Sequence, residues 1–432
     1  MKFLQTGDWH LGKIFHETSL IPDQEAFLSQ ITAELSNAQN DKKPYDALIV
    51  PGDIYDRSVP PSEAVTLLST FLTNTHRTFS RLHIFILSGN HDSADRLSFA
   101  SQILADDNIH ICTDTSHLTD PVIVGKGNGA AAVYQIPFLH PGEIRRGNEA
   151  DAAVLSEEGS QPDLFSGHES FQNVPVLRTQ QELITEAAVR IQKYHHKTYA
   201  DLPAVVCAHL FTTTGRVSNS ERSCVGTAEQ VDADIFSRFS YTALGHLHGV
   251  QKVGKKSNVW YSGAPLAYSF DDSPETFMLS VCIEKDKEQE TVLVNKLPFI
   301  PLHKVIRLEG PFEKFYGKES DRQIISTNSE NYVEIICTDN SVPENPMVLL
   351  RQNFHNILSF RKQDSLPGGS NTTMENRRKV IESDSVDKPE KLFDLFIHDV
   401  YGNKVPSGKD FTDERKLFLK LAENYSWTEE QT

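Results

Sequence analysis

Aspartate, asparagine and histidine side chains recur directly after short hydrophobic runs of this 432-residue chain. There are five such positions, in chain order Thr6-Gly-Asp8-Trp-His10, Pro51-Gly-Asp53-Ile-Tyr-Asp56, Ser88-Gly-Asn90-His91-Asp92, His209, and Gly245-His246-Leu-His248. Mixed carboxylate, amide and imidazole ligands suit manganese, iron or zinc better than calcium or a soft metal. These residues are enough to hold two ions, so the sequence predicts a dinuclear metal site.

The spacing within two of these motifs also favours metal binding. Asp8 and His10, like His246 and His248, are two positions apart, so in extended backbone both members of each pair point to the same side. Each pair can therefore hold one cation between its side chains. A glycine before the first polar residue of four motifs permits a tight turn between strand and loop.

Each motif, taken alone, also has an ordinary structural explanation. A Gly-Asp pair after a strand is usually a turn, and a single strand-end histidine such as His209 is more often structural. His246 and His248 could form a solvated loop pair. Five such motifs at five successive strand ends are much harder to explain as coincidence, and the constellation is therefore interpreted as a site.

The hydrophobic runs before the motifs are short and rich in aliphatic residues, which is typical of buried strands. Strands are predicted over residues 2–6, 47–50, 83–87, 204–208 and 241–244. Apolar residues at helical spacing predict helices over 22–40, 60–77 and around 181–194. This alternation indicates an α/β core, in which ligands bind where the carboxyl ends of the strands meet.

The chain is expected to contain a first domain over 1–285 and a smaller α+β domain over 286–365. Within the first, residues 141–180 read as a long surface insertion. The charged run 284–290 separates two apolar strands and predicts a hairpin turn. In the smaller domain, strand-like segments 304–308 and 332–337 precede a helix-like stretch over 346–360.

The C-terminal part has a different composition. Residues 366–390 are rich in Ser, Asn, Gly and charge, which is typical of a linker. The tail, 391–432, contains two helix-like stretches with apolar residues, 391–400 and 412–425, and has little domain of its own to pack on. It is predicted to be a helical segment that docks a partner.

Composition excludes several classes of protein. The chain has 42 Lys+Arg against 59 Asp+Glu and a formal charge of -17, which argues against nucleic-acid binding by charge alone, although a local basic groove or a second subunit could supply phosphate contacts. No apolar run approaches the roughly 18 residues of a membrane span. Gln5 and Asp8 interrupt any secretory signal, so a cytoplasmic location is expected.

The order of the motifs, D-x-H, G-D-x-x-D, G-N-H-D, a later H and G-H-x-H, resembles that of the calcineurin-like metallophosphoesterases. The resemblance implies an α/β sandwich of two mixed β-sheets flanked by helices, and a site for two divalent metal ions, with Mn²⁺ as the expected metal. It implies two ligand sets that share a bridging carboxylate: Asp8, His10, Asp53 and His248 for one ion, and Asp53, Asn90, His209 and His246 for the other. Such a pair of ions can activate a water molecule and hold the scissile phosphate.

The same resemblance leaves His91 outside both ligand sets. We therefore expect His91 to stabilise the transition state or to protonate the leaving alkoxide. Asp56 is expected to orient His91. Asp56 could instead be a turn or cap residue, and Asp92 remains an alternative for the orienting role.

Residues 7–13 and the segment around Asp53 further resemble nucleases of this family that work with an ATPase. This implies 3′–5′ exonuclease activity at duplex DNA ends and endonuclease activity at hairpins, in DNA repair, recombination and replication. It also implies a coiled-coil ATPase partner and a homodimer within a heterotetramer, which the helix over 60–77 would support. The alternatives are a phosphomonoesterase or small-molecule phosphodiesterase of the same family, and a scaffold protein without activity.

Overall fold

The structure is a computed structural model, and it describes residues 1–145, 176–213, 215–216, 230–254, 258–286, 289–339, 341–363, 393, 411–412 and 415–419. The chain divides into two units, Met1–Gln363 and Asp364–Thr432. Almost all of the described residues belong to the first unit. Within the part of the chain that the structure describes, none of the helices combines the length and hydrophobicity that crossing a bilayer requires.

The first large sheet has the strand order β16-β15-β1-β4-β5-β6. Its parallel strands are β1 (Lys2–Gln5), β4 (Ala47–Val50), β5 (His83–Leu87) and β6 (Ile109–Cys112), and the antiparallel hairpin of β15 (Phe277–Asp286) and β16 (Gln289–Pro298) forms one edge. The hairpin predicted at the charged run is thus confirmed. It also extends the first sheet beyond residue 285, where the sequence places a domain boundary.

The second large sheet has the strand order β13-β14-β12-β9-β8-β7. Its strands are β7 (Val122–Val124), β8 (Ala131–Ile136), β9 (Ala204–His209), β12 (Tyr241–Gly245), β13 (Gln251–Val253) and β14 (Val259–Tyr261). The central strands β8, β9, β12 and β14 are parallel, so their carboxyl ends lie at one edge of the sheet.

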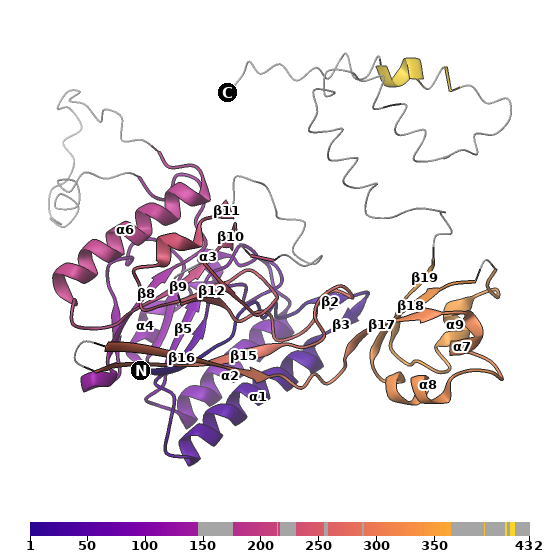
Figure 1. Ribbon diagram of the computed structural model, residues 1–432, viewed down its shortest axis with the longest axis horizontal. Coiled ribbons are helices and arrows are strands. Elements are labelled where there is room, and N and C mark those ends of the chain that lie inside the picture. Colours follow the sequence, from indigo (N-terminus) through magenta and orange to yellow (C-terminus); the bar gives the residue numbers. More distant parts are fainter. Residues whose placement is uncertain are drawn as a thin grey trace. The chain divides into compact units, whose positions relative to one another are not determined.

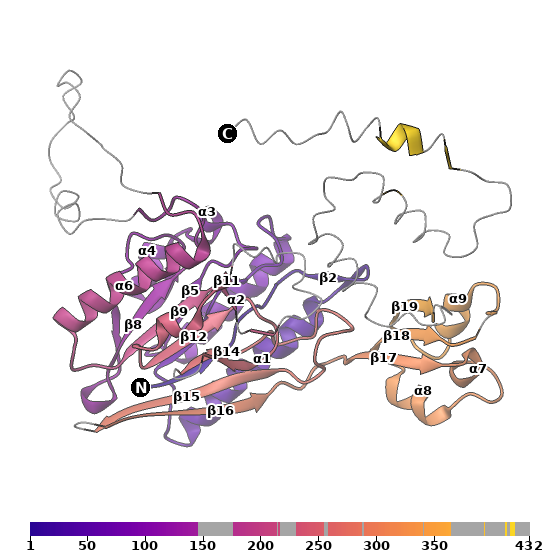
Figure 2. The same ribbon diagram turned by 45° about the horizontal axis from the view of Figure 1, so that its top comes forward.

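Hydrophobic residues fill three layers around these sheets. Side chains such as Phe3, Phe85 and Tyr241 form the buried layer between the two sheets. Helices α1 (Ile21–Asn40) and α2 (Ser62–Thr78) cover the outer face of the first sheet, and α6 (Gln180–Thr198) covers the second (Figures 1 and 2). The aliphatic strands are buried on both faces because each lies between a helix layer and the other sheet. The predicted sandwich of two mixed sheets flanked by helices is confirmed.

Several short elements complete this part of the chain. They are β2 (Ile14–Phe15), β3 (Thr18–Ser19), α3 (Ala94–Leu97), α4 (Ser101–Asp106), η1 (Gly127–Gly129), β10 (Phe211–Thr212), β11 (Gln230–Val231) and η4 (Ala233–Phe236).

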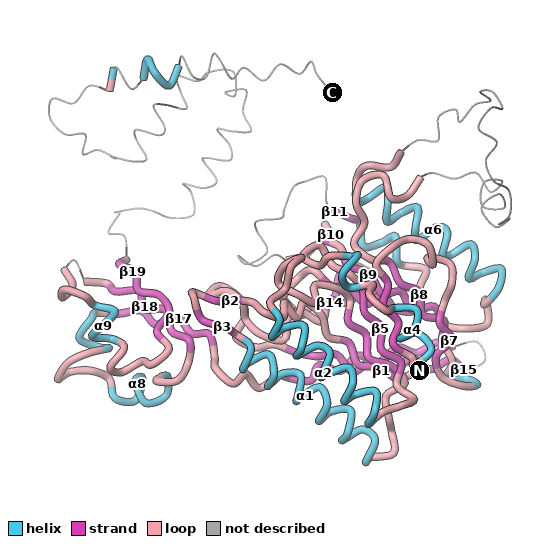
Figure 3. Tube along the Cα trace, turned by 180° about the vertical axis from the view of Figure 1, so that it is seen from behind, coloured by secondary structure: helices cyan, strands magenta, loops and turns pink. Residues whose placement is uncertain are grey.

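A small domain, defined here as residues 303–363, follows the hairpin, and its strands and short helices form a group of their own in Figure 3. It has its own hydrophobic core. Three parallel strands, in the order β17-β18-β19, pack against short helices. The elements are β17 (Val305–Gly310), α7 (Phe312–Phe315), α8 (Arg322–Asn328), β18 (Tyr332–Cys337), α9 (Pro346–Leu350) and β19 (Ile357–Lys362).

The helix predicted over residues 346–360 is wrong. Helix α9 ends at Leu350, and the chain then forms β19, which pairs in parallel with β18. Phe354 and Ile357 are buried in the core of the small domain, so the apolar spacing that suggested one long helix serves two different elements. Pairing with β19 satisfies backbone groups of β18 that would otherwise lack partners.

Other predictions fall largely on residues outside the described part of the chain. This holds for most of the insertion expected over 141–180, for the linker over 366–390 and for most of the tail. In the tail, the rings of Phe393 and Phe418 lie 5.5 Å apart, so the two predicted helical stretches are in contact at this point.

Candidate metal centre

The loops that follow β1 and β4 run side by side beyond the ends of the strands. The Asp8 backbone N–H donates to the Gly52 carbonyl (3.2 Å), and the His10 N–H donates to the Asp53 carbonyl (3.0 Å). The parallel pairing of the two strands therefore continues into their loops. It is this continued pairing that brings Asp8, His10 and Asp53 together.

The backbone of these loops adopts left-handed conformations at the polar residues themselves. Asp8, His10 and Asp53 have φ angles of 53°, 44° and 49°. Each such residue costs about 1–3 kcal/mol and persists only where its surroundings enforce it, as the hydrogen bonds between the two loops do here. Strain of this kind is concentrated at functional sites.

The carboxylate of Asp53 is at the centre of the cluster. Its Oδ2 lies 3.8 Å from His10 Nε2 and 3.5 Å from His209 Nε2, and its Oδ1 accepts a hydrogen bond from the His91 backbone N–H (3.0 Å). A Cβ atom at Gly89 would overlap Asp53 Oδ1, so only glycine permits this approach. Asp53 thus lies between two imidazoles, where a bridging carboxylate would be.

On one side of Asp53, three side chains meet at a single amide oxygen. Asn90 Oδ1 lies 2.9 Å from His209 Nε2 and 3.0 Å from His246 Nδ1. The Pro51 carbonyl, 2.9 Å from His209 Nδ1, can only accept a hydrogen bond. In the neutral ring the proton is therefore on Nδ1, and Nε2 faces the oxygens of Asn90 and Asp53 as a lone pair. Several acceptors converging in this way fit a bound cation.

On the other side of Asp53, the facing atoms are again ring nitrogens. His10 Nε2 and His248 Nε2 are 3.2 Å apart. Asp8 Oδ1 accepts a hydrogen bond from the His246 backbone N–H (2.7 Å), which links the loop after β1 to the loop after β12. The structure thus brings all seven predicted ligands into one connected cluster, although their role as ligands stays a prediction.

Burial sets the protonation of this cluster. It lowers the pKa of His209, and it lowers that of His246 to about 3. Burial alone would raise the pKa of Asp53, but the neighbouring His209 and His10 outweigh it and hold this pKa well below its usual range. His209 and His246 are therefore neutral and Asp53 is ionised near neutral pH, which are the forms that bind metals.

Metal binding should accordingly release almost no protons from His209 and His246 at pH 6.0. A histidine with the ordinary pKa of about 6.5 would be about three-quarters protonated at this pH, and its metal affinity would fall as the pH falls. Because the pKa values of His209 and His246 are lowered, we expect a nearly constant affinity between pH 7.5 and 6.0 for the Mn²⁺ ion that they would hold with Asn90. Isothermal titration calorimetry in buffers of different ionisation enthalpy measures the protons released; about one proton per bound ion would contradict the prediction.

His91 lies at the edge of the cluster, beside the first ligand set. Its Nδ1 is 3.0 Å from the backbone carbonyl of Asp56, and its ring packs edge-on against His10 with centroids 4.9 Å apart. The Asp56 carboxylate instead accepts from Lys13 Nζ (2.7 Å) and lies 3.8 Å from His10 Nδ1. Asp56 therefore contacts His91 through its main chain.

The alternative orienting residue, Asp92, has a different role. Its carboxylate accepts hydrogen bonds from the backbone N–H groups of Ile54 (3.0 Å), Tyr55 (2.9 Å) and Gly89 (2.9 Å). It thus ties the loop after β4 to the loop after β5. Asp92 holds the backbone on which Asp53 and Asn90 are presented.

Asp56→Asn is expected to change activity less than about 10-fold, because the carbonyl that faces His91 belongs to the main chain and is kept. The comparison of kcat for Asp56→Asn and His91→Asn checks this. A loss in Asp56→Asn as large as that in His91→Asn would show that the carboxylate itself is required.

Sequence reasoning missed three residues beside the candidate ligands. The Tyr268 ring packs against His10 and His248, with centroids 5.3 and 5.6 Å away. Asp272 Oδ2 is 3.9 Å from His248 Nδ1, and Gln24 contacts the backbone of His10. The polar residues that follow β14 could have indicated Tyr268 and Asp272 as part of the site. Gln24 could not be recognised, because a single glutamine in an amphipathic helix gives no such signal.

Comparison with known proteins agrees with the presence of a metal centre at this position. Residues 1–211 match the family model described as calcineurin-like phosphoesterase. Three relatives are named as the SbcD component of the nuclease SbcCD. The Staphylococcus epidermidis protein is 27% identical, and the alignment covers 83% of this chain and 85% of the relative. The Staphylococcus saprophyticus protein is 25% identical, and the alignment covers 98% of this chain and 99% of the relative. The Escherichia coli K12 protein is 26% identical, and the alignment covers 92% of this chain and 97% of the relative.

Proposed function

We propose that the chain is the nuclease component of an SbcCD-like complex, because residues 1–211 match the calcineurin-like phosphoesterase family model and SbcD relatives align along most of the chain. The observation that carries the proposal is the cluster around Asp53, in which side chains from five strand ends meet. The similarity to SbcD nucleases along almost the whole chain supports a DNA substrate over a small phosphate ester.

The proposed reaction is hydrolysis of a phosphodiester bond. A pair of divalent ions, Mn²⁺ in our proposal, would generate the nucleophile from water at neutral pH and stabilise the charge on the phosphate. Asp53 would hold both ions, and the side chains on either side of it would complete the two ligand sets. The buried, neutral imidazoles of His209 and His246 would bind without first losing a proton.

His91 is proposed to act on the leaving oxygen. The Asp56 carbonyl accepts a hydrogen bond from the Nδ1–H of His91, and so fixes the ring with Nε2 on the opposite side. In the protonated ring, Nε2–H can donate its proton to the departing alkoxide. Lys13 Nζ forms an ion pair with the Asp56 carboxylate (2.7 Å).

The DNA substrates that we propose are duplex ends, cleaved 3′–5′, and hairpins, cleaved internally. A chain with a net charge of -17 attracts DNA weakly by itself. A partner that supplies part of the phosphate contacts would compensate for this charge. We propose an SbcC-like coiled-coil ATPase as that partner. A homodimer within a heterotetramer is also proposed, and exposed Val65 on α2 is available to such a contact.

The test of the proposed function uses intact protein loaded with Mn²⁺, with and without an SbcC-like ATPase. We expect cleavage of end-labelled linear duplex and hairpin DNA, which chelation abolishes, and little hydrolysis of p-nitrophenyl phosphate. Efficient hydrolysis of the monoester without cleavage of DNA would instead favour a phosphomonoesterase. No hydrolysis of either substrate, with or without the ATPase, would favour a scaffold protein.

The tail over 391–432 is proposed to bind the ATPase. Phe393 is buried against Phe418, whereas Leu417 next to it is 60% exposed, so an apolar side chain remains available. Deletion of residues 391–432 is expected to abolish co-elution with the ATPase in size-exclusion chromatography while Mn²⁺ binding is kept. Leu417→Ser should weaken co-elution and the neighbouring Lys416→Ser should not; unchanged co-elution of the deletion variant would refute the docking proposal.

A further inference from the structure

Two pairs of neighbouring residues connect the small domain to the metal centre. One pair is Asp23 and Gln24 in the first turn of α1, and the other is Asp271 and Asp272 in the loop between β14 and β15. In each pair, one side chain contacts the small domain and the other contacts a candidate ligand or the segment that carries it. We call each pair, together with its contacts, a relay.

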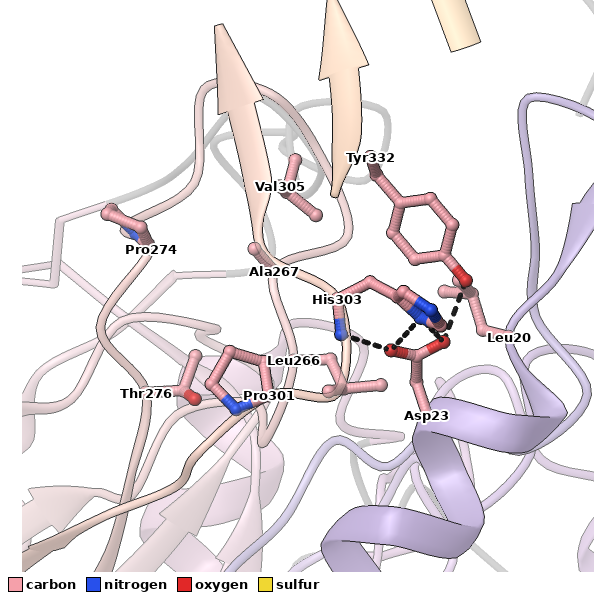
Figure 4. A pocket seen from close by; sticks show the side chains of 10 residues that line it. All are labelled: Leu20, Asp23, Leu266, Ala267, Pro274, Thr276, Pro301, His303, Val305 and Tyr332. Atoms are coloured by element: carbon pink, nitrogen blue, oxygen red, sulfur yellow. Dashed lines mark hydrogen bonds and ion pairs between the residues drawn. The ribbon is translucent and has the colours of Figure 1, made fainter. Parts of the chain in front are cut away.

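The first relay begins at a buried carboxylate. Asp23 Oδ1 accepts a hydrogen bond from the His303 backbone N–H (3.1 Å) and lies 3.0 Å from His303 Nδ1 (Figure 4). Asp23 Oδ2 accepts from the Tyr332 hydroxyl (2.7 Å). Burial and then the hydrogen bond to Asp23 raise the pKa of Tyr332, so its hydroxyl stays a donor. One carboxylate thus secures both the start of the small domain and its central strand.

Gln24 carries the first relay to a candidate ligand. Its Nε2 donates to the His10 carbonyl (2.8 Å), and its Oε1 accepts from the Gly12 N–H (2.9 Å). Gln24 is completely buried and therefore holds the backbone on both sides of this turn in one place. Because His10 has a φ of 44°, its ring position depends on this hold.

The second relay begins at an ion pair. Arg307 on β17 contacts Asp271 (2.6 Å) and also the buried Glu334 on β18 (2.6 Å). Next to Asp271, Asp272 Oδ2 accepts from the Tyr268 N–H (2.9 Å) and lies 3.9 Å from His248 Nδ1.

Tyr268 joins the second relay to the first. Its ring packs against both His10 and His248, and its hydroxyl donates to the Trp9 carbonyl (2.5 Å). Both relays therefore end at His10 and His248, which belong to the first ligand set. The second set is held differently, since His209 is fixed by the Pro51 carbonyl.

We propose that the position of the small domain controls the geometry of the ion held by His10 and His248, and has little effect on the ion held by Asn90, His209 and His246. Gln24 and Tyr268 are then positioning residues for the first ion. This inference rests on the proposed two-metal site. A substrate that displaced the small domain would alter one ion of the pair and leave the other in place.

The test measures Mn²⁺ affinity of intact protein in two backgrounds. Asn90→Ala removes a ligand of the second ion, and His248→Ala removes a ligand of the first, so each background reports mainly on one site. Tyr332→Phe and Arg307→Gln then break the two relays at their far ends without touching a candidate ligand. Tyr45→Phe is the matched control for the first, because its hydroxyl contacts Glu34 and Ser280 instead. Arg361→Gln is the control for the second, because Arg361 contacts Glu334, whereas Arg307 contacts both Glu334 and Asp271.

We expect each relay variant to weaken Mn²⁺ binding about 3- to 10-fold in the Asn90→Ala background, a smaller effect than the 10- to 100-fold typical of groups that contact a ligand directly. In the His248→Ala background we expect no change. Gln24→Ala, which contacts the ligand segment itself, should approach the larger range. Circular dichroism melting of every variant checks the fold, and two independent relays keep the test valid should one variant unfold.

The outcomes separate this inference from the proposed function. The coupling would be overturned if the relay variants had equal effects in both backgrounds, or if they behaved like their controls. The proposed function would still stand in that case, provided that the protein binds two Mn²⁺ ions. If the unmodified protein bound no Mn²⁺, the proposed metal site itself would fail.

Discussion

Asp53→Asn is expected to reduce Mn²⁺-dependent hydrolysis at least about 10³-fold. The carboxylate of Asp53 lies between His10 and His209, so its removal takes a shared negative charge from both ligand sets. Stabilisation by a metal pair is worth several kcal/mol, and about 4 kcal/mol corresponds to a factor of 10³ in rate. The amide keeps the shape of the side chain and an oxygen that can accept from the His91 N–H, so the fold should be retained. Steady-state hydrolysis and Mn²⁺ stoichiometry measure the two effects together.

The matched control for this substitution is Asp120→Asn, since Asp120 is an exposed carboxylate paired with His117. It should leave both rate and metal content unchanged. If Asp53→Asn retained two bound ions and activity within about 10-fold of the unmodified protein, a bridging role for Asp53 would be wrong.

His91→Asn is expected to lower kcat by about 10²- to 10⁴-fold, which is the range for loss of a general acid. Because His91 contacts Asp53 through its backbone N–H, which the substitution keeps, the number of bound Mn²⁺ ions should remain two. Loss of activity with retained metal would thus distinguish His91 from the ligands. His117→Asn, at an exposed histidine, is the matched control.

A second result would change the role of His91. His10, Asp56 and His91 also offer ligand atoms within 4.8 Å of one another. If His91→Asn lost one Mn²⁺ ion together with activity, His91 would be a ligand and a different residue would have to supply the proton.

The strands that carry the site could be predicted from the sequence to within about one residue. The run Ala47–Val50 is apolar throughout and His83–Leu87 is apolar after its first residue, because each is covered by a helix layer on one face and the other sheet on the opposite face. A polar residue directly after such a run is therefore conspicuous. This local contrast is the reason that residues far apart in the chain could be grouped before the structure was considered.

Contacts that depend on tertiary packing could not be predicted in this way. The apolar spacing over 346–360 is compatible with a helix. The second half of this segment is a strand because it pairs with the edge of β18. Likewise, nothing in the pattern of α1 distinguishes Gln24 from a solvent-facing glutamine. The role of the Asp56 carbonyl was also hidden, because sequence motifs indicate side chains rather than main-chain groups.

The two-metal site is tested most directly by the location of the metal ions. Crystals of the intact protein grown with Mn²⁺ should show two anomalous scattering peaks at the manganese absorption edge, roughly 3.5–4 Å apart. We expect one peak beside His10 and His248, the other beside Asn90 and His209, and the Asp53 carboxylate between them. A single peak, or peaks away from Asp53, would contradict the two-metal site on which the proposed nuclease activity depends.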